Sequence, residues 1–296
     1  MHSILNKVDF YITNVCNLTC NRCNRFNNYS FTGWQRWSDY QPQYEQWGKL
    51  VNLRAITIMG GEPFLNPTLN DWVVGLNQIF GIEIQVLTNG SRFRQMKELY
   101  PSMLYRSPRS NARNHIGVSL HNLKDFETMR EDILYFLEGP VKEYKKGDPA
   151  NMWNSDWYFI DRNGIMVNVY ISNNFGEAAI TTDQYNRFRL HNNDINAAHQ
   201  NCAFVKWKSY HFIRGKLYKC GPVALMPEFD QQHNFDISDE DRSLLNSYKA
   251  LDVDNFADYH EEFFANLDNP IAQCKFCPVE YKAETIYPLR KGAKSS

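Results

Sequence analysis

The sequence lacks any long uninterrupted hydrophobic run and any large excess of one charge. No stretch approaches the roughly 18 apolar residues of a membrane-spanning helix, and residues 1–15 lack the apolar core of a secretion signal. We therefore expect a cytoplasmic protein without a membrane partner. The 32 basic and 33 acidic residues give a net charge of -1, so no overall positive field would attract nucleic acid.

The composition is typical of a folded globular protein. Of the 296 residues, 43% are hydrophobic, 15% are aromatic and 22% are charged, which argues against a disordered, fibrous or membrane chain. At about 150 residues per domain, the length predicts one large domain, or one domain with a smaller companion. The seven cysteines are an odd number in a chain without a secretion signal, which argues against disulfides and for metal or redox chemistry.

Strand and helix patterns alternate along the N-terminal part of the chain. The expected strands are residues 7–13, 54–59, 83–88 and 115–120, and the expected helices are residues 68–80, 93–100 and 124–137. This alternation predicts a parallel β/α architecture. Residues 157–160 and 165–171 flank a polar Asp-Arg-Asn-Gly segment, which predicts a hairpin that interrupts the alternation.

The sequence pattern changes from Cys202 onward. Residues 206–213 and 216–219 are predicted to be two strands around a glycine turn. Ser238 is expected to cap a helix that extends to about residue 251. We therefore expect a small α+β unit in the C-terminal part.

Three cysteines, Cys16, Cys20 and Cys23, follow the first expected strand within eight residues. Three thiolates of one loop can hold three irons of a cubane and leave the fourth iron open to a small molecule. The alternatives are a zinc site or buried free thiols. Structural zinc normally takes four protein ligands, and the nearby loop residues offer no histidine to complete such a site.

This Cys-x3-Cys-x2-Cys segment resembles the radical S-adenosylmethionine superfamily, and the second expected strand ends in that family's second hallmark, Gly60-Gly61-Glu62-Pro63. The resemblance implies a partial (β/α)6 TIM barrel in residues 1–198, with a [4Fe-4S] cluster on the three cysteines that binds S-adenosylmethionine. It also implies that the glycine loop and the Glu62 carboxylate receive the cofactor's amino group. Glycines permit close approach, and a carboxylate accepts charge-assisted hydrogen bonds from an ammonium.

Four further positions resemble cofactor contacts of this family. Thr88 and Asn89 end the third expected strand and Ser119 ends the fourth, at the edge where barrel active sites form. The alternative for Asn89 is an ordinary turn, and for Ser119 it is a satisfied strand-end hydroxyl. Arg22 stands where many members carry an aromatic residue beside the adenine, and a guanidinium can also stack on a base.

The other four cysteines are Cys202, Cys220, Cys274 and Cys277. Four thiolates suit a fully ligated iron-sulfur cluster or a structural zinc, and their number alone does not choose between the two metals. Their spacing resembles the twitch extension of the superfamily, which implies an auxiliary [4Fe-4S] cluster domain in residues 199–296. The whole layout resembles the twitch-bearing dehydrogenase of butirosin biosynthesis, which oxidises an aminocyclitol.

The resemblance implies reductive cleavage of S-adenosylmethionine to a 5′-deoxyadenosyl radical that abstracts a substrate hydrogen. It also implies a reductant such as flavodoxin or ferredoxin. We expect a radical oxidoreductase of a small polar substrate such as a sugar, cyclitol or nucleoside, with the auxiliary cluster as electron acceptor. The alternatives are a peptide-modifying enzyme and a non-catalytic, metal-stabilised binding protein.

No side chain is assigned a catalytic role from the sequence. His115 and His121 flank an expected strand and are interpreted as ordinary strand-end or surface histidines. Trp34, Trp37 and Trp47 are interpreted as core or lid aromatics.

Overall fold

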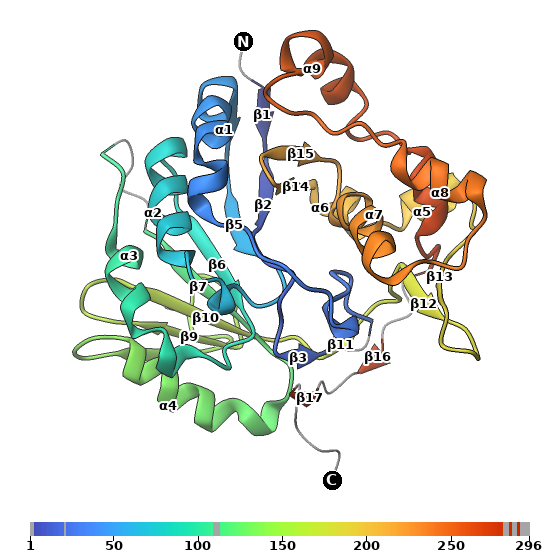
Figure 1. Ribbon diagram of the computed structural model, residues 1–296. Coiled ribbons are helices and arrows are strands. Elements are labelled where there is room, and N and C mark those ends of the chain that lie inside the picture. The colour runs from blue at the N-terminus through green and yellow to red at the C-terminus, as the bar shows by residue number, and fades with distance from the viewer. Residues whose placement is uncertain (1–2, 21, 109–112, 281–283, 286–288, 291–296) are drawn as a thin grey trace.

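The computed structural model describes residues 3–20, 22–108, 113–280, 284–285 and 289–290. It is a mixed α/β structure built around one large sheet (Figure 1). No helix among the described residues is both long and apolar enough to span a membrane.

The largest sheet in the described part of the chain has nine strands, in the order β15-β14-β2-β5-β6-β7-β10-β9-β8. Its central strands run parallel, and in sheet order they are β14 (Ser209–Ile213), β2 (Lys7–Tyr11), β5 (Ile56–Met59), β6 (Ile84–Thr88), β7 (His115–Leu120) and β10 (Met166–Ile171). The antiparallel strands at its two edges are β15 (Lys216–Tyr218), β9 (Trp157–Ile160) and β8 (Lys142–Lys145). The predicted parallel core is thus confirmed, and its description as a partial barrel stays a prediction.

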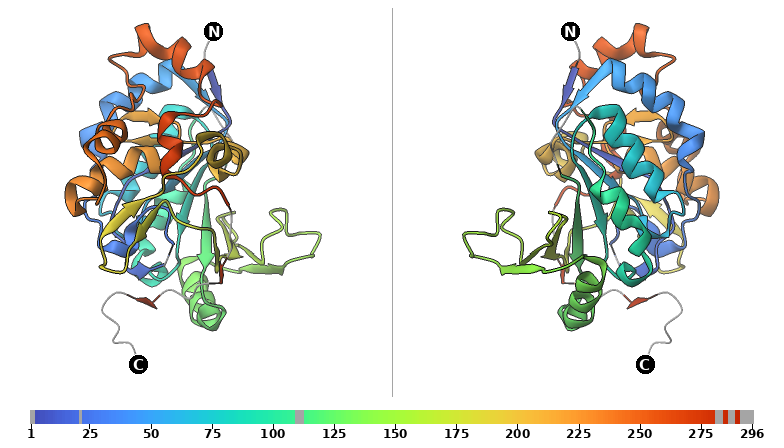
Figure 2. Two further views of the ribbon diagram at one scale, coloured as in Figure 1. Left: turned by 90° about the vertical axis from the view of Figure 1, so that its right-hand side faces the viewer. Right: turned by 90° about the vertical axis from the view of Figure 1, so that its left-hand side faces the viewer.

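The predicted hairpin is confirmed as the antiparallel pair β9 and β10. Its turn is fixed by Asp161, whose carboxylate accepts hydrogen bonds from the backbone N–H groups of Asn163 and Ile165, both at 2.9 Å. Gly164 follows with a φ of +79°, a conformation that favours glycine. Figure 2 shows β8 and β9 projecting from the rest of the molecule.

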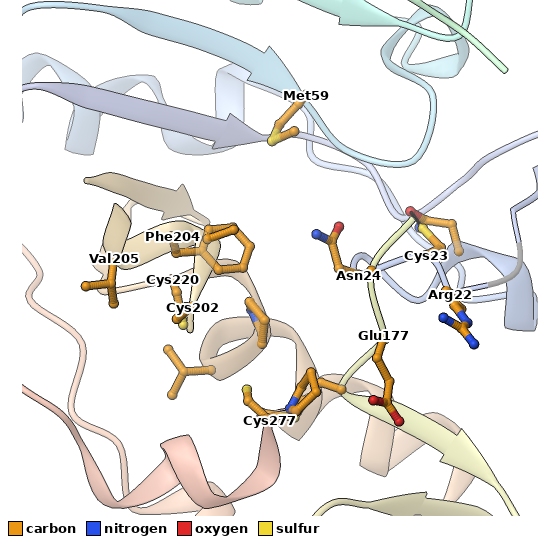
Figure 3. A pocket seen from close by; sticks show the side chains of 18 of the residues that line it. Arg22, Cys23, Asn24, Met59, Glu177, Cys202, Phe204, Val205, Cys220 and Cys277 are labelled. Atoms are coloured by element: carbon orange, nitrogen blue, oxygen red, sulfur yellow. Dashed lines mark hydrogen bonds between the residues drawn. The ribbon is translucent and has the colours of Figure 1, made fainter. Parts of the chain in front are cut away.

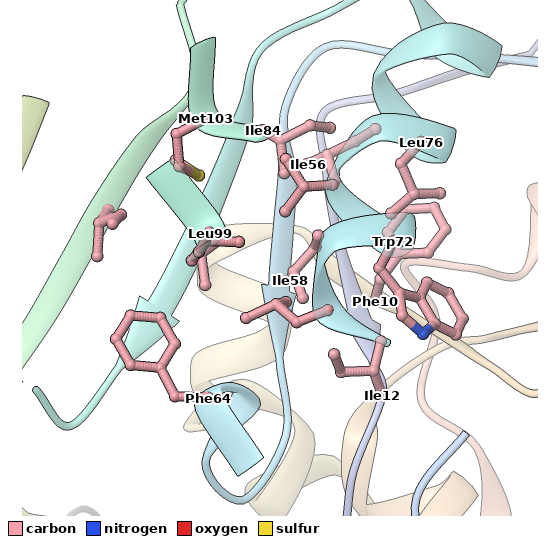
Figure 4. Close-up of a cluster of buried hydrophobic side chains, with 14 of the residues drawn as sticks. Phe10, Ile12, Ile56, Ile58, Phe64, Trp72, Leu76, Ile84, Leu99 and Met103 are labelled. Atoms are coloured by element: carbon pink, nitrogen blue, oxygen red, sulfur yellow. The ribbon is translucent and has the colours of Figure 1, made fainter. Parts of the chain in front are cut away.

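The main core lies between the sheet and the helices α1 (Trp37–Leu50) and α2 (Leu69–Phe80). Alternate strand residues such as Phe10 and Ile58 pack there against Trp72 (Figure 4), because successive strand side chains point to opposite faces. Full burial of each such side chain contributes about 1.5–3 kcal/mol. Asp9, the residue before Phe10 on β2, is also buried, and its carboxylate accepts a hydrogen bond from Ser209 Oγ at 2.7 Å.

The remaining described α-helices are α3 (Tyr100–Leu104), α4 (Phe126–Phe136), α5 (Ile195–Gln200), α6 (Ala203–Trp207), α7 (Gly221–His233), α8 (Asp239–Asn246) and α9 (Phe256–Ala265). The predicted cap of α8 is confirmed, since the Ser238 hydroxyl accepts a hydrogen bond from Asp241 N at 3.1 Å. The helix ends at Asn246, earlier than expected.

For two segments, the predicted type of secondary structure is wrong. Residues 206–213 are not one strand, because α6 extends to Trp207 and Lys208 adopts a left-handed φ of +47° before β14 begins. Residues 93–100 are not one helix but two 3-10 turns, Phe93–Gln95 and Lys97–Leu99, followed by α3. Pro101 lies in the first turn of α3, where proline is favoured.

The segment from Cys202 onward shares both a sheet and a core with the N-terminal part. Strand β14 pairs with β2 in parallel, and Phe212 packs on Phe10 with ring centroids 5.0 Å apart. Leu217 and Leu251 belong to the same buried cluster. A domain division between residues 198 and 199 stays a prediction.

Four two-stranded sheets complete the described structure: β1 (Ser3–Leu5) with β4 (Val51–Leu53), β3 (Leu18–Thr19) with β17 (Leu289–Arg290), β11 (Asn174–Phe175) with β16 (Glu284–Thr285), and β12 (Ile180–Thr182) with β13 (Phe188–Leu190). Through β17 and β16, the C-terminal segment pairs with the cysteine loop after β2 and with the segment after β10.

Candidate functional site

A cavity of about 440 Å³ lies at the C-terminal ends of the parallel strands, the edge where β/α active sites form. Met59, Thr88 and Ser119 line it from β5, β6 and β7. The cavity is also lined by every cysteine of the chain, namely Cys16, Cys20, Cys23, Cys202, Cys220, Cys274 and Cys277. The structure therefore brings the two sets of cysteines, far apart in sequence, to one space (Figure 3).

The first set is held by consecutive tight turns after β2. Cys23 N donates to Cys20 O at 3.1 Å, and Phe26 N donates to Cys23 O at 3.0 Å. Arg22, between Cys20 and Cys23, adopts a left-handed φ of +63° and lines the cavity. These turns fold the loop back on itself, so that its three thiols face one space.

The thiols of this loop suit a metal centre chemically. None of the cysteines forms a disulfide in the described structure. Burial raises the pKa of Cys20, and the charges of Cys23 and Cys16 raise it further. Neighbouring thiols raise one another's pKa, and a bound metal cation stabilises their thiolate forms.

The Gly60-Gly61 loop is hydrogen-bonded to the segment that leads into this cysteine loop. Gly61 N donates to Thr13 O at 2.7 Å, and Glu62 N donates to Val15 O at 2.8 Å. Gly60 and Gly61 line the cavity. The two sequence hallmarks are therefore parts of one backbone unit.

Glu62 and Pro63 lie behind the cavity wall rather than among its lining residues. The Glu62 carboxylate is fully buried and accepts hydrogen bonds from Thr88 Oγ1 at 2.6 Å, Asn89 N at 2.7 Å and Phe64 N at 3.0 Å. In this arrangement both carboxylate oxygens are used within the protein, and Glu62 ties the glycine loop to the end of β6. Its contact with a cofactor stays a prediction.

The other predicted cofactor contacts lie in the cavity wall. Thr88, Asn89 and Ser119 line it, as does Arg22. Asn89 Nδ2 donates to Asn17 Oδ1 at 3.0 Å, and Asn17 Nδ2 donates to Ser91 Oγ at 2.8 Å. The end of β6 is thus joined to the cysteine loop by side-chain hydrogen bonds.

The second set of cysteines lies in or next to short helices. Cys202 and Cys220 are the N-terminal flanking residues of α6 and α7, while Cys274 lies in the 3-10 helix Ala272–Phe276 and Cys277 follows it. Burial, then the charge of Cys202, raises the pKa of Cys220 to about 12. The four cysteines thus line the cavity from helices and a 3-10 turn of the C-terminal part of the chain.

A buried cation accompanies this second set. Lys219 is only 6% exposed, and its Nζ donates to Leu267 O and, at 2.6 Å, to Asn269 O. Burial lowers the pKa of Lys219, whereas the charges of Cys220 and Cys274 raise it. The ammonium therefore lies close to these thiols while its hydrogen bonds fix the loop before Cys274.

Arg25 joins the two cysteine-bearing segments by a buried contact. It is 7% exposed, and its guanidinium lies 5.1 Å from the ring centroid of Phe204, two residues after Cys202. It also donates to Asn24 Oδ1 at 3.1 Å. This buried contact holds the loop after Cys23 against α6.

In the described structure, no three or more His, Cys, Asp or Glu side chains form a group that could hold a single metal ion. The thiols line the cavity without converging on one ion position. The ligand assignments, and the choice of iron or zinc for the second set, stay predictions.

The cavity also contains ionisable residues that the sequence analysis did not assign to it. His121 lines the cavity directly after β7, with Nδ1 at hydrogen-bonding distance from Ser172 O. Burial lowers its pKa, which favours the neutral ring. Its position two residues after Ser119 was the available signal. Glu177, His199 and Asp268 lie in loops or short helices, where no local pattern marked them.

Comparison with known proteins identifies no family. No family model matches the chain, and no curated protein matches it. Three solved structures of SuiB from Streptococcus suis are similar over 45% of this chain, each with 16% identity and a TM-score of 0.36. They are described as SuiB bound to S-adenosylmethionine, SuiB bound to precursor peptide SuiA, and SuiB.

The similarity spans about a third of SuiB, at 32%, 30% and 31% of the respective chains.

Proposed function

We propose that this protein is a radical S-adenosylmethionine enzyme that oxidises a small polar substrate bound between its two sets of cysteines. The observation that carries the proposal is the single cavity at the strand ends, lined by Cys16, Cys20 and Cys23 on one loop and by four further thiols. The loop's attachment to Gly60-Gly61 through backbone hydrogen bonds supports it.

The proposal gives the two donor sets different tasks. Cys16, Cys20 and Cys23 would hold a [4Fe-4S] cluster with one open iron, and the other four thiols would hold an auxiliary cluster. When bound, these clusters and S-adenosylmethionine supply a 5′-deoxyadenosyl radical and an acceptor for the substrate's electron. Gly60, Gly61, Thr88, Asn89, Ser119 and Arg22 would position the cofactor from the cavity wall.

The chain's own residues contribute enclosure and orientation. The cavity volume of about 440 Å³ lies within the range of small-molecule sites, roughly 300–1,000 Å³. Phe204, Val223 and Met226 line part of it and would exclude water from a reactive intermediate. The Asn24 side chain, which also lines the cavity, offers hydrogen bonds to a substrate.

Anaerobic reconstitution with iron and sulfide, followed by reduction with dithionite in the presence of S-adenosylmethionine, tests the proposal. The wild-type protein should form 5′-deoxyadenosine and methionine. Cys16→Ala should reduce 5′-deoxyadenosine to background even when the second cysteine set retains its metal, because three thiolates are the minimum for such a cluster. Unchanged production by Cys16→Ala, or none by the iron-loaded wild type, would refute the proposal.

A further inference from the structure

The carboxylates that line the cavity differ in whether they already have a partner. Asp268 accepts hydrogen bonds from Lys208 Nζ at 2.7 Å and from Tyr210 Oη at 3.0 Å, and Glu280 also has an interaction partner. Glu177 has neither a hydrogen bond nor an ion pair with any residue that the structure describes. Among the residues that the structure describes, it is therefore the carboxylate of the cavity wall without a hydrogen-bonding or ion-pair partner.

Glu177 is presented to the cavity from a backbone held on both sides. Ser172 N, at the start of its segment, donates to Leu120 O at 2.8 Å, and β11 just before it pairs with β16. After it, Ala178 O lies 2.9 Å from His191 Nε2. Figure 3 shows Glu177 between Arg22 and Cys277.

The positively charged side chains near Glu177 in the cavity interact with other groups. Lys219 gives its hydrogen bonds to the carbonyls of Leu267 and Asn269, and Arg22 belongs to the cysteine loop and has an interaction of its own. A partly buried carboxylate without a donor is stabilised most by a ligand that brings positive charge and N–H groups.

We propose that Glu177 binds a primary ammonium group of the substrate, so that the substrate is an amine. The inference rests on the proposed function, because it treats the ligand of this cavity as the substrate. A small amino sugar and the lysine side chain of a peptide share this chemistry. Glu177 would orient either one by fixing its nitrogen between the two cysteine sets.

Binding measurements on reconstituted protein with S-adenosylmethionine test the inference. The probes are glucosamine and its neutral match glucose, and the tripeptides Gly-Lys-Gly and Gly-Met-Gly. The proteins are the wild type, Glu177→Gln, and Glu261→Gln as a control, since Glu261 is exposed on α9. Isothermal titration calorimetry gives each dissociation constant.

The wild type should bind at least one ammonium probe about ten-fold or more tightly than its neutral match, as a charge-assisted hydrogen bond provides. Glu177→Gln should bring this ratio close to one, while Glu261→Gln should keep it. A preference for glucosamine indicates a small-molecule amine, and a preference for Gly-Lys-Gly indicates a peptide. Both support the role of Glu177.

A wild type without preference for either ammonium probe overturns the inference, as does a preference that survives in Glu177→Gln. Failure of the proposed function looks different. In that case the iron-loaded wild type forms no 5′-deoxyadenosine, whatever its preference among the probes.

Discussion

The backbones of Gly61 and Val15 approach so closely that no side chain fits between them. A methyl group on Gly61 would lie 2.2 Å from Val15 O and 3.0 Å from Cys16 Cβ. Val15 O in turn accepts the hydrogen bond from Glu62 N. The glycine loop therefore sets the position of Cys16, the first of the three cysteines predicted to bind a metal, through direct backbone contact.

Gly61→Ala should consequently disturb both stability and the first metal site. The added methyl group meets a carbonyl rather than a flexible side chain, so the loop must move, at an expected cost of about 1–3 kcal/mol. Urea unfolding of the metal-free protein measures this cost, and iron analysis after reconstitution measures the retention of the first cluster. Both should fall.

Gly147→Ala is the control for this experiment. A methyl group there meets nothing within 4 Å, although its φ of +87° carries some backbone strain. If Gly61→Ala matches Gly147→Ala in stability and in iron content, the contact between Gly61 and Val15 does not position Cys16.

Glu62 makes the stability of the metal-free protein depend on pH. Burial raises the pKa of its carboxyl from an ordinary 4.5 to about 6. Below pH 4.5 the carboxyl is protonated in both folded and unfolded chains. Between these values the folded chain holds the proton more tightly, so the contribution of Glu62 to stability is lost as the pH rises through about 6.

Glu62→Gln should therefore become more stable relative to the wild type as the pH rises from 4.5 to 7, by about 2 kcal/mol from 1.36 kcal/mol per pKa unit. Gln resembles the protonated carboxyl and does not titrate. Urea unfolding of both proteins across this range measures the difference. A difference that stays constant with pH would show that the carboxyl titrates alike in both states.

The affinity of each protein for S-adenosylmethionine tests the separate, predicted role of Glu62 in cofactor binding.

Local sequence patterns predicted the elements whose apolar residues are continuous or alternate cleanly. Strand β7 begins and ends where expected, and each of its residues except Ser119 is buried. Helix α1 was missed, although Trp37, Tyr44 and Trp47 share its buried face at helical spacing, because Pro42 interrupts the pattern. Proline in a helix interior removes a hydrogen bond and argues against a helix.

Long-range relationships could not be predicted from local patterns. Strand β14 pairs with β2 about 200 residues earlier, as the hydrogen bond between Ser209 and Asp9 shows. Spacing alone identified each set of cysteines but not their common cavity. Glu177 lines the same cavity from a loop, and no local pattern in that loop indicates which groups surround its carboxylate.

The last prediction separates iron from zinc at Cys202, Cys220, Cys274 and Cys277. If these four thiols hold a second [4Fe-4S] cluster, the reconstituted wild type should contain close to twice the iron of a Cys274→Ala/Cys277→Ala variant. This variant is expected to fold less stably, because it loses the cross-link between the start of α7 and the segment after α9. It should still form some 5′-deoxyadenosine, since Cys16, Cys20 and Cys23 lie on a separate loop.

Cys16→Ala is the matched control, because it should lose the other half of the iron. Four zinc–thiolate contacts by metal-edge spectroscopy, with no second iron cluster after anaerobic preparation, would contradict the electron-acceptor role and favour radical chemistry without net oxidation.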